Sequence, residues 1–461
     1  MTSIRRLEPH SDIAGIFAAF AEETEIAFLD SSMQSGTARF SILGTRPYMR
    51  IAYDDELRVD GVTVTGDPRE FLRDFFAKKT IPNDTHLPII DGAIGFMTYD
   101  YGMMLENVSS RHEDSSDLPG FAFLFFDCFI IADHEEKSTF LVANGHLEDS
   151  EEALDRMERR IAGIHGASTL AEATATSLSE DSIAKSDCSR EKYEETVREV
   201  TRHIVDGDIY VMNLSRRISI RSRIPPRVLF ERLRNAHPSP LGAYVQFAEL
   251  TAVSSSPERF LRVTGNRVET RPIKGTRPRG RTQEEDAGLR EELSSSIKDR
   301  SELMMIVDLE RNDLNKVCIP GSVQVTDANR VEEYASVFQL VTTVEGVLSE
   351  DKNAVDALHA LFPGGSITGA PKRRAMEIID QLEKSRRGLY TGAIGYLSLN
   401  GDADFSVVIR TLVHRGDEYV LGTGGGITYE SDPIAEYEET VQKAAPFLHA
   451  LGVRDIDASR I

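Results

Sequence analysis

The sequence predicts an α+β protein in which two similar β-sheets face each other. Residues 1–145 are typical of strands with turns between them, and residues 190–450 alternate helices with strands. The pentapeptides 92–96 and 392–396 both read Gly-Ala-Ile-Gly-aromatic, and this short internal echo favours two related, facing sheets. The clearest strands in the first part are expected at residues 37–44, 50–53 and 121–126.

The order along the chain suggests four regions. Residues 1–145 form an N-terminal region, and residues 146–189 are rich in Glu, Ser, Ala and Thr. In this second region we expect a helix near 149–164 and then a linker. Residues 190–450 contain all the strong motifs, and residues 451–461 form a C-terminal tail.

Composition limits the classes of partner. The 461 residues carry a net charge of −22, which argues against nucleic acid or an anionic membrane as a partner. Neither a signal peptide nor a membrane span is expected. The three cysteines, Cys128, Cys188 and Cys318, are far apart and form no zinc or disulfide pattern, which fits a reducing cytoplasm.

Lys274 lies in a segment with unusual chemistry, Arg-Pro-Ile-Lys-Gly-Thr-Arg-Pro-Arg at 271–279. The glycine after the lysine lets a ligand approach the backbone closely. The three arginines favour anions and favour the neutral amine that a nucleophilic lysine needs. From composition alone, a cationic surface loop is the alternative.

A glycine-rich stretch at 422–426 precedes a predicted helix that begins with Asp432 as N-cap and Pro433 as first residue. The exposed amides of such a turn bind carboxylate or phosphate. On the helix, Glu436, Glu439 and Lys443 share one face. Two carboxylates beside a ligand-binding loop suit a divalent cation, although a solvated face is the more common role of such a pattern.

Two other glutamates are candidates for chemistry. Glu302 precedes the apolar run 303–307, so its helix is expected to be largely buried and Glu302 to need a partner such as a metal. Asp308, Arg311, Asn312 and Asp313 are expected to satisfy one another and the helix end. Glu258 alone resembles an exposed turn residue, but beside Lys274 across two adjacent strands it could carry protons.

Arg410 is expected within a buried β-branched strand at 405–413, where it needs a carboxylate from a ligand or from the protein. The segment 363–372 precedes another helix, and its Ser366 and Thr368 could donate to an anion. Tyr390 could supply a hydroxyl. Each of these would alone be ordinary turn chemistry.

Taken together, these segments resemble the chorismate-binding enzymes over nearly the whole chain. The matching stretches follow the family order at 207–216, 256–258, 272–276, 306–313, 363–372 and 431–443. The resemblance implies two large, mainly antiparallel β-sheets packed as a sandwich with helices outside. It also implies Mg²⁺ as cofactor and chorismate as substrate. The implied Mg²⁺ ligands are Glu302 and Glu439, with Glu436 close by; the implied substrate contacts are Arg410, Tyr390, Lys443, Gly425, Gly426, Ser366 and Thr368.

Lys274 indicates one branch of this family. The Pro-Ile-Lys-Gly-Thr run resembles the aminodeoxychorismate synthase branch, whereas the anthranilate synthase branch usually has alanine at this position. The resemblance implies that Lys274 adds to the substrate ring, that ammonia then displaces it, and that Glu258 handles protons. Isochorismate and salicylate synthases carry a lysine at the position of Val211, so those activities are not expected.

Some features depart from the family pattern or concern a second pocket. Gln339 replaces a common histidine, and Val211 replaces a glutamine common in both amino-transferring branches. Ser31 and Pro240 lie in segments that resemble the pocket where relatives hold tryptophan. Whether tryptophan binds or regulates here stays open.

The resemblance leaves one leading hypothesis and two alternatives. The leading hypothesis is amination of chorismate, a transaminase-type step towards p-aminobenzoate and folate. Because no glutaminase motif is recognisable, the ammonia is expected from a separate glutamine amidotransferase subunit or from solution. The first alternative is the anthranilate synthase reaction of tryptophan synthesis, and the second is a non-catalytic sensor of chorismate or tryptophan.

Overall fold

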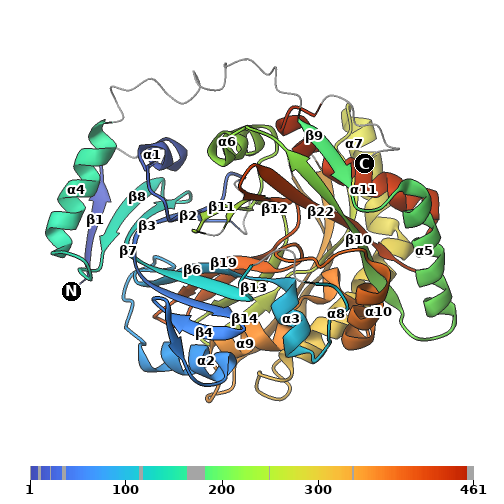
Figure 1. Ribbon diagram of the computed structural model, residues 1–461, viewed down its shortest axis with the longest axis horizontal. Helices are drawn as coiled ribbons and strands as arrows, with labels where there is room; N and C mark the ends of the chain where they lie inside the picture. Colours follow the sequence, from blue (N-terminus) through green and yellow to red (C-terminus); the bar gives the residue numbers. More distant parts are fainter. Residues whose placement is uncertain are drawn as a thin grey trace.

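The computed structural model describes residues 2–8, 12–20, 22–33, 38–113, 118–163, 182–248, 250–334 and 337–453. The described strands form two large layers with helices outside, and all their pairings are antiparallel (Figure 1). The α+β class and the two antiparallel layers predicted from the sequence are therefore confirmed. The layers are not separate sheets, because the long strands β3 and β7 belong to both.

The first layer follows a hydrogen-bonded order that draws strands from the whole chain. This order is β1 (Ser3–Leu7), β8 (Ser138–Ala143), β7 (Phe121–Asp133), β3 (Phe40–Asp54), β2 (Ile26–Asp30), β11 (Leu241–Gln246), β12 (Thr251–Ser256), β21 (Thr411–Arg415), β22 (Glu418–Ile427) and β10 (Val211–Arg221), with β9 (Ile183–Ser186) and β18 (Gly369–Ala370) beside β10.

The second layer begins from the other halves of β3 and β7. Its order is β5 (Val62–Val64), β4 (Glu56–Val59), β3, β7, β6 (Gly92–Met97), β19 (Ala393–Ser398), β20 (Ala403–Val407), β13 (Arg259–Thr264), β14 (Arg267–Thr270) and β17 (Val337–Val347), with β15 (Ile273–Pro278) and β16 (Gln324–Glu333) beside β17. Strands of the first 145 residues thus pair with strands of the last 250 in both layers.

Helices cover the outer faces of both layers and the end of the molecule near β10. Against the first layer pack α1 (Ile13–Ala19), α4 (Ser150–Ala162), α6 (Pro226–Ala236) and α11 (Pro433–Ala450). Against the second pack α2 (Pro68–Lys78), α7 (Gln283–Ser295), α8 (Ile297–Leu314) and α9 (Ala354–Leu361). Beside β10 lie α3 (Tyr99–Leu105), α5 (Arg190–Val205), α10 (Lys372–Leu382) and a 3₁₀ turn at Gly365–Ile367. None of the described helices combines the length and the apolar character that a bilayer crossing needs.

Two local predictions need correction. The strands expected at 37–44 and 50–53 are one strand, β3, in which Arg46 has a φ of 58° and the pairing with β7 shifts between Pro47 and Met49. A bulge therefore replaces the expected turn. The helix expected near 149–164 is confirmed as α4, but the expected linker contains the strand β9; residues 164–181 lie outside the described residues.

The repeated sequence at 92–96 and 392–396 does not come from two facing sheets. The prediction based on this repeat was therefore wrong. The two copies of the repeat are the neighbouring strands β6 and β19, in which Gly95 lies opposite Gly395. A Cβ atom at Gly95 would lie 2.1 Å from the carbonyl oxygen of Ala122, and one at Gly395 would lie 2.1 Å from that of Asp404. The repeated glycines are therefore explained by the close approach of neighbouring backbones within one layer.

Helix α8 carries a fully buried carboxyl group at Glu310, whose exposed fraction is 5 %. The Thr270 hydroxyl oxygen lies 2.8 Å from the carbonyl oxygen of Phe260 and 2.9 Å from Oε2 of Glu310. A hydroxyl has one proton and the carbonyl can only accept, so both contacts are satisfied when Glu310 is protonated and donates to Thr270. Burial also raises the pKa of Glu310 to about 8.

We predict that Glu310→Gln gains stability relative to the wild type as pH rises from about 5 to about 8. In this range the unfolded glutamate, with an ordinary pKa of about 4.3, loses its proton while the folded one keeps it, so wild-type stability falls with pH. A neutral amide removes this penalty, which is on the order of a few kcal/mol.

Urea unfolding at several pH values measures the difference. Glu291→Gln, at an exposed position of α7, is the matched control and should show no such trend. A difference between Glu310→Gln and wild type that stayed constant from pH 5 to pH 8 would contradict the buried, protonated state.

Candidate active site

Lys274 lies where the 3₁₀ turn meets the glycine-rich strand β22. Its Nζ donates a hydrogen bond of 3.1 Å to the carbonyl oxygen of Ser366. A Cβ atom at Gly426 would lie 3.4 Å from this Nζ and 4.0 Å from Cγ2 of Val211, so a bare backbone faces the ammonium group. The structure thus joins Lys274, Ser366, Gly426 and Val211, which are far apart in the sequence.

Glu258 is buried beside Lys274, with an exposed fraction of 5 %. Burial raises the pKa of its carboxyl group, while a hydrogen bond with Ser366 and the charge of Lys274 act in the opposite direction. The proximity expected from the sequence is present, but two details were wrong. Glu258 is not exposed, and it does not face Lys274 across adjacent strands, because β14 and β17 connect β13 to β15.

Three carboxylates from two helices approach the same region. Glu302 lies on α8, and Glu436 and Glu439 lie on α11. Burial raises the pKa values of Glu302 and Glu436, and the negative charge of Glu436 adds to the effect on Glu302. A Cβ atom at Gly425 would lie 3.0 Å from Oε2 of Glu436 and 3.7 Å from Oε1 of Glu439, so this glycine leaves space between them. Oxygen ligands around such a space fit Mg²⁺.

The shared helix face predicted for α11 is confirmed. Asp432 caps the helix by accepting from the amides of Ile434 and Ala435. Lys443 Nζ lies 2.6 Å from Oε1 of Glu439 and donates to the carbonyl oxygen of Gly424 at 2.8 Å. Burial alone would raise the pKa of Glu439, but the charge and hydrogen bond of Lys443 bring it below its usual value.

Glu302, Glu436 and Glu439 do not place three ligand atoms within 4.8 Å of one another. In the described parts of the chain, only His86, Asp133 and Glu136 place three ligand atoms within 4.8 Å of one another. The group of His86, Asp133 and Glu136 belongs to an ion-pair cluster, because Arg39 Nη2 lies 2.6 Å from Oδ2 of Asp133. Cation binding by Glu302, Glu436 and Glu439 would therefore require their side chains to move together.

Arg410 lies in a break between two strands, so its predicted place inside one strand was wrong. Strand β20 ends at Val407, β21 begins at Thr411, and Arg410 has a φ of 51°. Its carbonyl oxygen accepts from the amide of Ser255 at 3.0 Å. Burial lowers the pKa of its guanidinium group, and the charge of Glu258 acts in the opposite direction. No ion pair within 4.0 Å joins Arg410 to a carboxylate of the described residues. A partly buried arginine of this kind suits an anionic ligand.

The segment 363–372 presents backbone rather than side-chain groups. The Thr368 hydroxyl donates to the carbonyl oxygen of Gly364 at 2.8 Å, and the Thr368 carbonyl accepts from the Asn213 amide at 2.8 Å. A substrate contact by Thr368 stays a prediction, since its proton is already used. Lys372 at the start of α10 forms a buried ion pair of 2.7 Å with Asp313.

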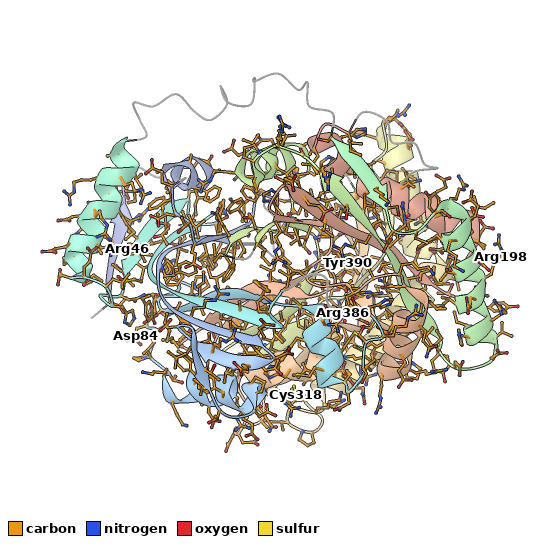
Figure 2. All side chains as sticks on the ribbon, viewed as in Figure 1. Arg46, Asp84, Arg198, Cys318, Arg386 and Tyr390 are labelled. Carbon is orange, nitrogen blue, oxygen red and sulfur yellow. The ribbon has the colours of Figure 1, made fainter. Side chains whose placement is uncertain are left out.

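Tyr390 packs flat against the glycine-rich strand. A Cβ atom at Gly422 would lie 2.1 Å from Cγ of the Tyr390 ring. Burial raises the pKa of this tyrosine to about 12, so its hydroxyl keeps its proton and can donate. Tyr390 lies near the middle of the molecule, below β22 and β10 in the view of Figure 2, whereas Arg198 lies on α5 at the edge.

The sequence analysis missed the buried ion pair that holds these segments together. Arg387 Nη2 lies 2.6 Å from Oε1 of Glu383, and the two side chains are 2 % and 5 % exposed. Arg387 also donates to the carbonyl oxygens of Ile367 at 2.7 Å and Asn213 at 2.8 Å. Glu383 accepts from the amide and the hydroxyl of Ser215, both at 2.8 Å. The pair therefore fixes the 3₁₀ turn against β10.

The three arginines around Lys274 were expected to favour anions and the neutral lysine amine, but each is paired with a carboxylate of the protein. Arg271 pairs with Glu332, Arg277 lies 3.1 Å from Asp299, and Arg279 lies 2.6 Å from Asp286. Their charges are compensated by these carboxylates, so we assign the three arginines a structural role.

Of the buried side-chain amides with an unpaired atom among the described residues, two lie on strands beside Gly426 and Thr276. Oε1 of Gln339, on β17, has no partner, and neither has Nδ2 of Asn213, on β10 opposite Gly426. Unpaired buried polar atoms are uncommon and often lie where a ligand or water binds.

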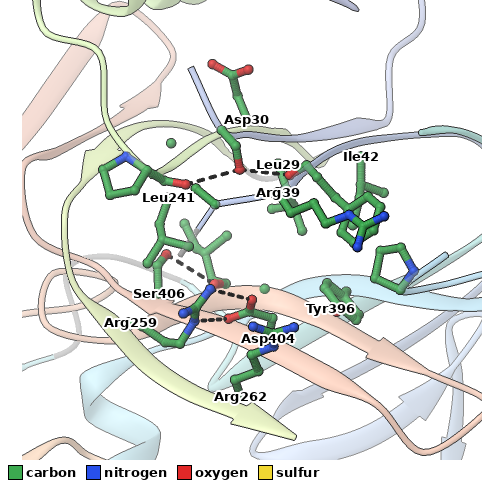
Figure 3. A pocket seen from close by; sticks show the side chains of 18 of the residues that line it. Leu29, Asp30, Arg39, Ile42, Leu241, Arg259, Arg262, Tyr396, Asp404 and Ser406 are labelled. Atoms are coloured by element: carbon green, nitrogen blue, oxygen red, sulfur yellow. Dashed lines mark hydrogen bonds and ion pairs between the residues drawn. The ribbon is translucent and has the colours of Figure 1, made fainter. Parts of the chain in front are cut away.

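Ser31 and Pro240 line a different cavity of about 300 Å³ between the two layers (Figure 3). Strands β2 and β11 of the first layer and β13, β19 and β20 of the second contribute to its wall. The Ser31 hydroxyl lies 3.2 Å from the carbonyl oxygen of Pro240, and Arg259 pairs with Asp404 across the floor. Neither Lys274 nor Glu258 lines this cavity. Its occupation by tryptophan stays a prediction.

We predict that Arg387→Met lowers the free energy of unfolding by about 3–5 kcal/mol, because Glu383 would keep a buried, uncompensated charge. Urea unfolding measures the loss, and Arg373→Met, at an exposed position of α10, is the control. A loss no larger than that of the control would show that the pair does not stabilise the fold.

Known proteins similar to this chain share one family. A family model described as chorismate binding enzyme matches residues 28–449. Aminodeoxychorismate synthase component 1 of Bacillus subtilis is 36% identical over 448 residues, covering 94% of this chain and 93% of that protein. Anthranilate synthase component 1 of Thermus thermophilus is 38% identical over 444 residues, covering 94% of each.

The fold is also found among solved structures. The crystal structure of anthranilate synthase component I from Streptococcus pneumoniae superposes with a TM-score of 0.79 and 31% identity, over 90% of this chain and 93% of that one. Together with the family match over most of the chain, these similarities identify the protein as a member of the chorismate-binding enzyme family.

Proposed function

We propose that this protein is the synthase component that converts chorismate and ammonia into 4-amino-4-deoxychorismate. The observation that carries the proposal is the position of Lys274, whose amine lies between the Ser366 carbonyl and the bare backbone of Gly426, beside the buried Glu258. A nucleophilic amine next to a proton carrier is the arrangement that covalent catalysis requires.

The surrounding groups suit a substrate with two carboxylates. Arg410 offers a guanidinium group without a carboxylate partner in the described chain, and Lys443 adds a second cation. The hydroxyl of Tyr390 adds a donor, and the backbone amides of Gly425 and Gly426 are further candidate donors. Mg²⁺ held by Glu302, Glu436 and Glu439 would neutralise one substrate carboxylate and draw electrons toward it.

The reaction then uses two displacements. The neutral amine of Lys274 forms a bond to C2 of the ring, the ring double bond shifts, and the C4 hydroxyl leaves as water after receiving a proton from Glu258. Ammonia next bonds to C4, the double bond shifts back, and the Lys274 amine leaves. Glu258 accepts the proton that the added ammonia loses, so atoms, protons and electrons balance over the cycle.

Neither Val211 nor Gln339 can transfer a proton in this reaction. Val211 lines the Gly426 side of the site with a side chain that cannot activate water, which agrees with amine rather than water addition. Gln339 can orient a hydroxyl but cannot transfer a proton. We therefore assign the proton transfers to Glu258 alone.

The rival function is the anthranilate synthase reaction, which starts from the same substrate and releases pyruvate. Relatives with either name are similar to this chain at comparable identity, so likeness alone does not separate the two. Lys274 is the residue that favours the first. In either case, a separate glutamine amidotransferase subunit would supply the ammonia.

We predict that Lys274→Ala lowers ammonia-dependent consumption of chorismate at least 100-fold, because the covalent step is lost. Lys185→Ala, at an exposed position of β9, should keep wild-type activity. The disappearance of chorismate with an ammonium salt and Mg²⁺ measures both. Full activity of Lys274→Ala would rule out the covalent mechanism.

A further inference from the structure

Three lysines lie around the three carboxylates of the candidate metal site. Lys443 lies 2.6 Å from Glu439, and Lys298 lies 4.0 Å from Oε1 of Glu302. Lys274 completes the set, since its charge acts on both Glu302 and Glu439. Each of the three carboxylates is therefore within reach of the charge of at least one lysine.

Lys298 differs from the other two lysines in how it is held. Lys443 and Lys274 donate hydrogen bonds to the carbonyl oxygens of Gly424 and Ser366. Lys298 forms no hydrogen bond within the described residues, and 47% of its side chain is exposed. It lies in the first turn of α8, so its flexible stem can move its ammonium group into water at low cost.

The charge of Lys298 nonetheless reaches all three glutamates. It stabilises the ionised forms of Glu302, Glu436 and Glu439, although these lie on two different helices. The ammonium group lies 4.0 Å from Oε1 of Glu302, beside a carboxylate that a divalent cation would have to bind. The other charged groups that act on these glutamates are Asp299 on α8, Lys443 on α11 and Lys274 on β15.

We propose that Lys298 is a resident counter-cation of the metal site, which a divalent cation must displace before the three glutamates can close around it. The proposal rests on the proposed function of the site. It also fits the spacing of the three carboxylates, which do not place three ligand atoms within 4.8 Å of one another.

A consequence is that the metal and the substrate should bind together. A divalent cation alone would add two positive charges beside the ammonium groups of Lys298 and Lys443. A substrate with two carboxylates brings two negative charges, so the pair enters without a net change of charge. Lys298 thereby favours binding of the divalent cation together with the substrate over binding of the cation before the substrate.

The test is the affinity for Mn²⁺, measured by calorimetry or electron paramagnetic resonance on the full chain with and without chorismate. We expect Lys298→Met to bind Mn²⁺ about tenfold more tightly than wild type without chorismate, since one nearby charge is removed. With chorismate present, the two proteins should differ little. Lys185→Met, which also removes one positive charge but far along the chain, should match wild type.

Each other result has a distinct meaning. Equal Mn²⁺ affinity of Lys298→Met and wild type without chorismate would overturn the inference and leave the proposed function standing. Weaker binding by Lys298→Met would also overturn it, because Lys298 would then position Glu302 rather than compete for it. If wild type bound no Mn²⁺ even with chorismate, the proposed metal site itself would be wrong. Thermal unfolding of each variant confirms that it is folded.

Discussion

The buried ion pair between Arg387 and Glu383 is the interaction on which the candidate site depends. It connects the end of α10, the 3₁₀ turn and β10, and these three segments carry or support Ser366, Tyr390 and the strand beside Gly426. A buried pair contributes little net stability compared with apolar packing, but it tolerates only one arrangement of its partners. We infer that it fixes the geometry around Lys274 before any substrate binds.

The fold brings the reacting groups together from distant parts of the sequence. Because β3 and β7 belong to both layers, the N-terminal strands lie inside the sheets that carry the site rather than in a domain of their own. Lys274 and Glu258 come from the second layer, whereas Gly425 and Gly426 come from the first. In a chain with a net charge of −22, the local cations Arg410, Lys274 and Lys443 are the groups that we propose attract an anionic substrate.

Helix capping and residue spacing correctly predicted the features that depend only on neighbouring residues in the sequence. The Asp432 cap, helix α4 and the shared face of α11 follow from spacing and capping alone. Arg410 was misplaced because β-branched neighbours favour a continuous strand, and nothing in the sequence reveals its left-handed backbone. Arg387 and Lys298 were missed although each has its carboxylate partner four residues away, because pairs at this spacing are usually solvated. The sequence signal for Arg387 is its spacing from Glu383, but nothing in the sequence reveals its bonds to the carbonyl oxygens of Ile367 and Asn213.

The most direct test of the account is the identity of the product. The purified chain would be incubated with chorismate, Mg²⁺ and an ammonium salt at alkaline pH, and the product identified by mass spectrometry. The account predicts a compound lighter than chorismate by the difference between a hydroxyl and an amino group, which an added lyase converts to p-aminobenzoate. Anthranilate together with pyruvate would contradict it and show that Lys274 does not determine the reaction.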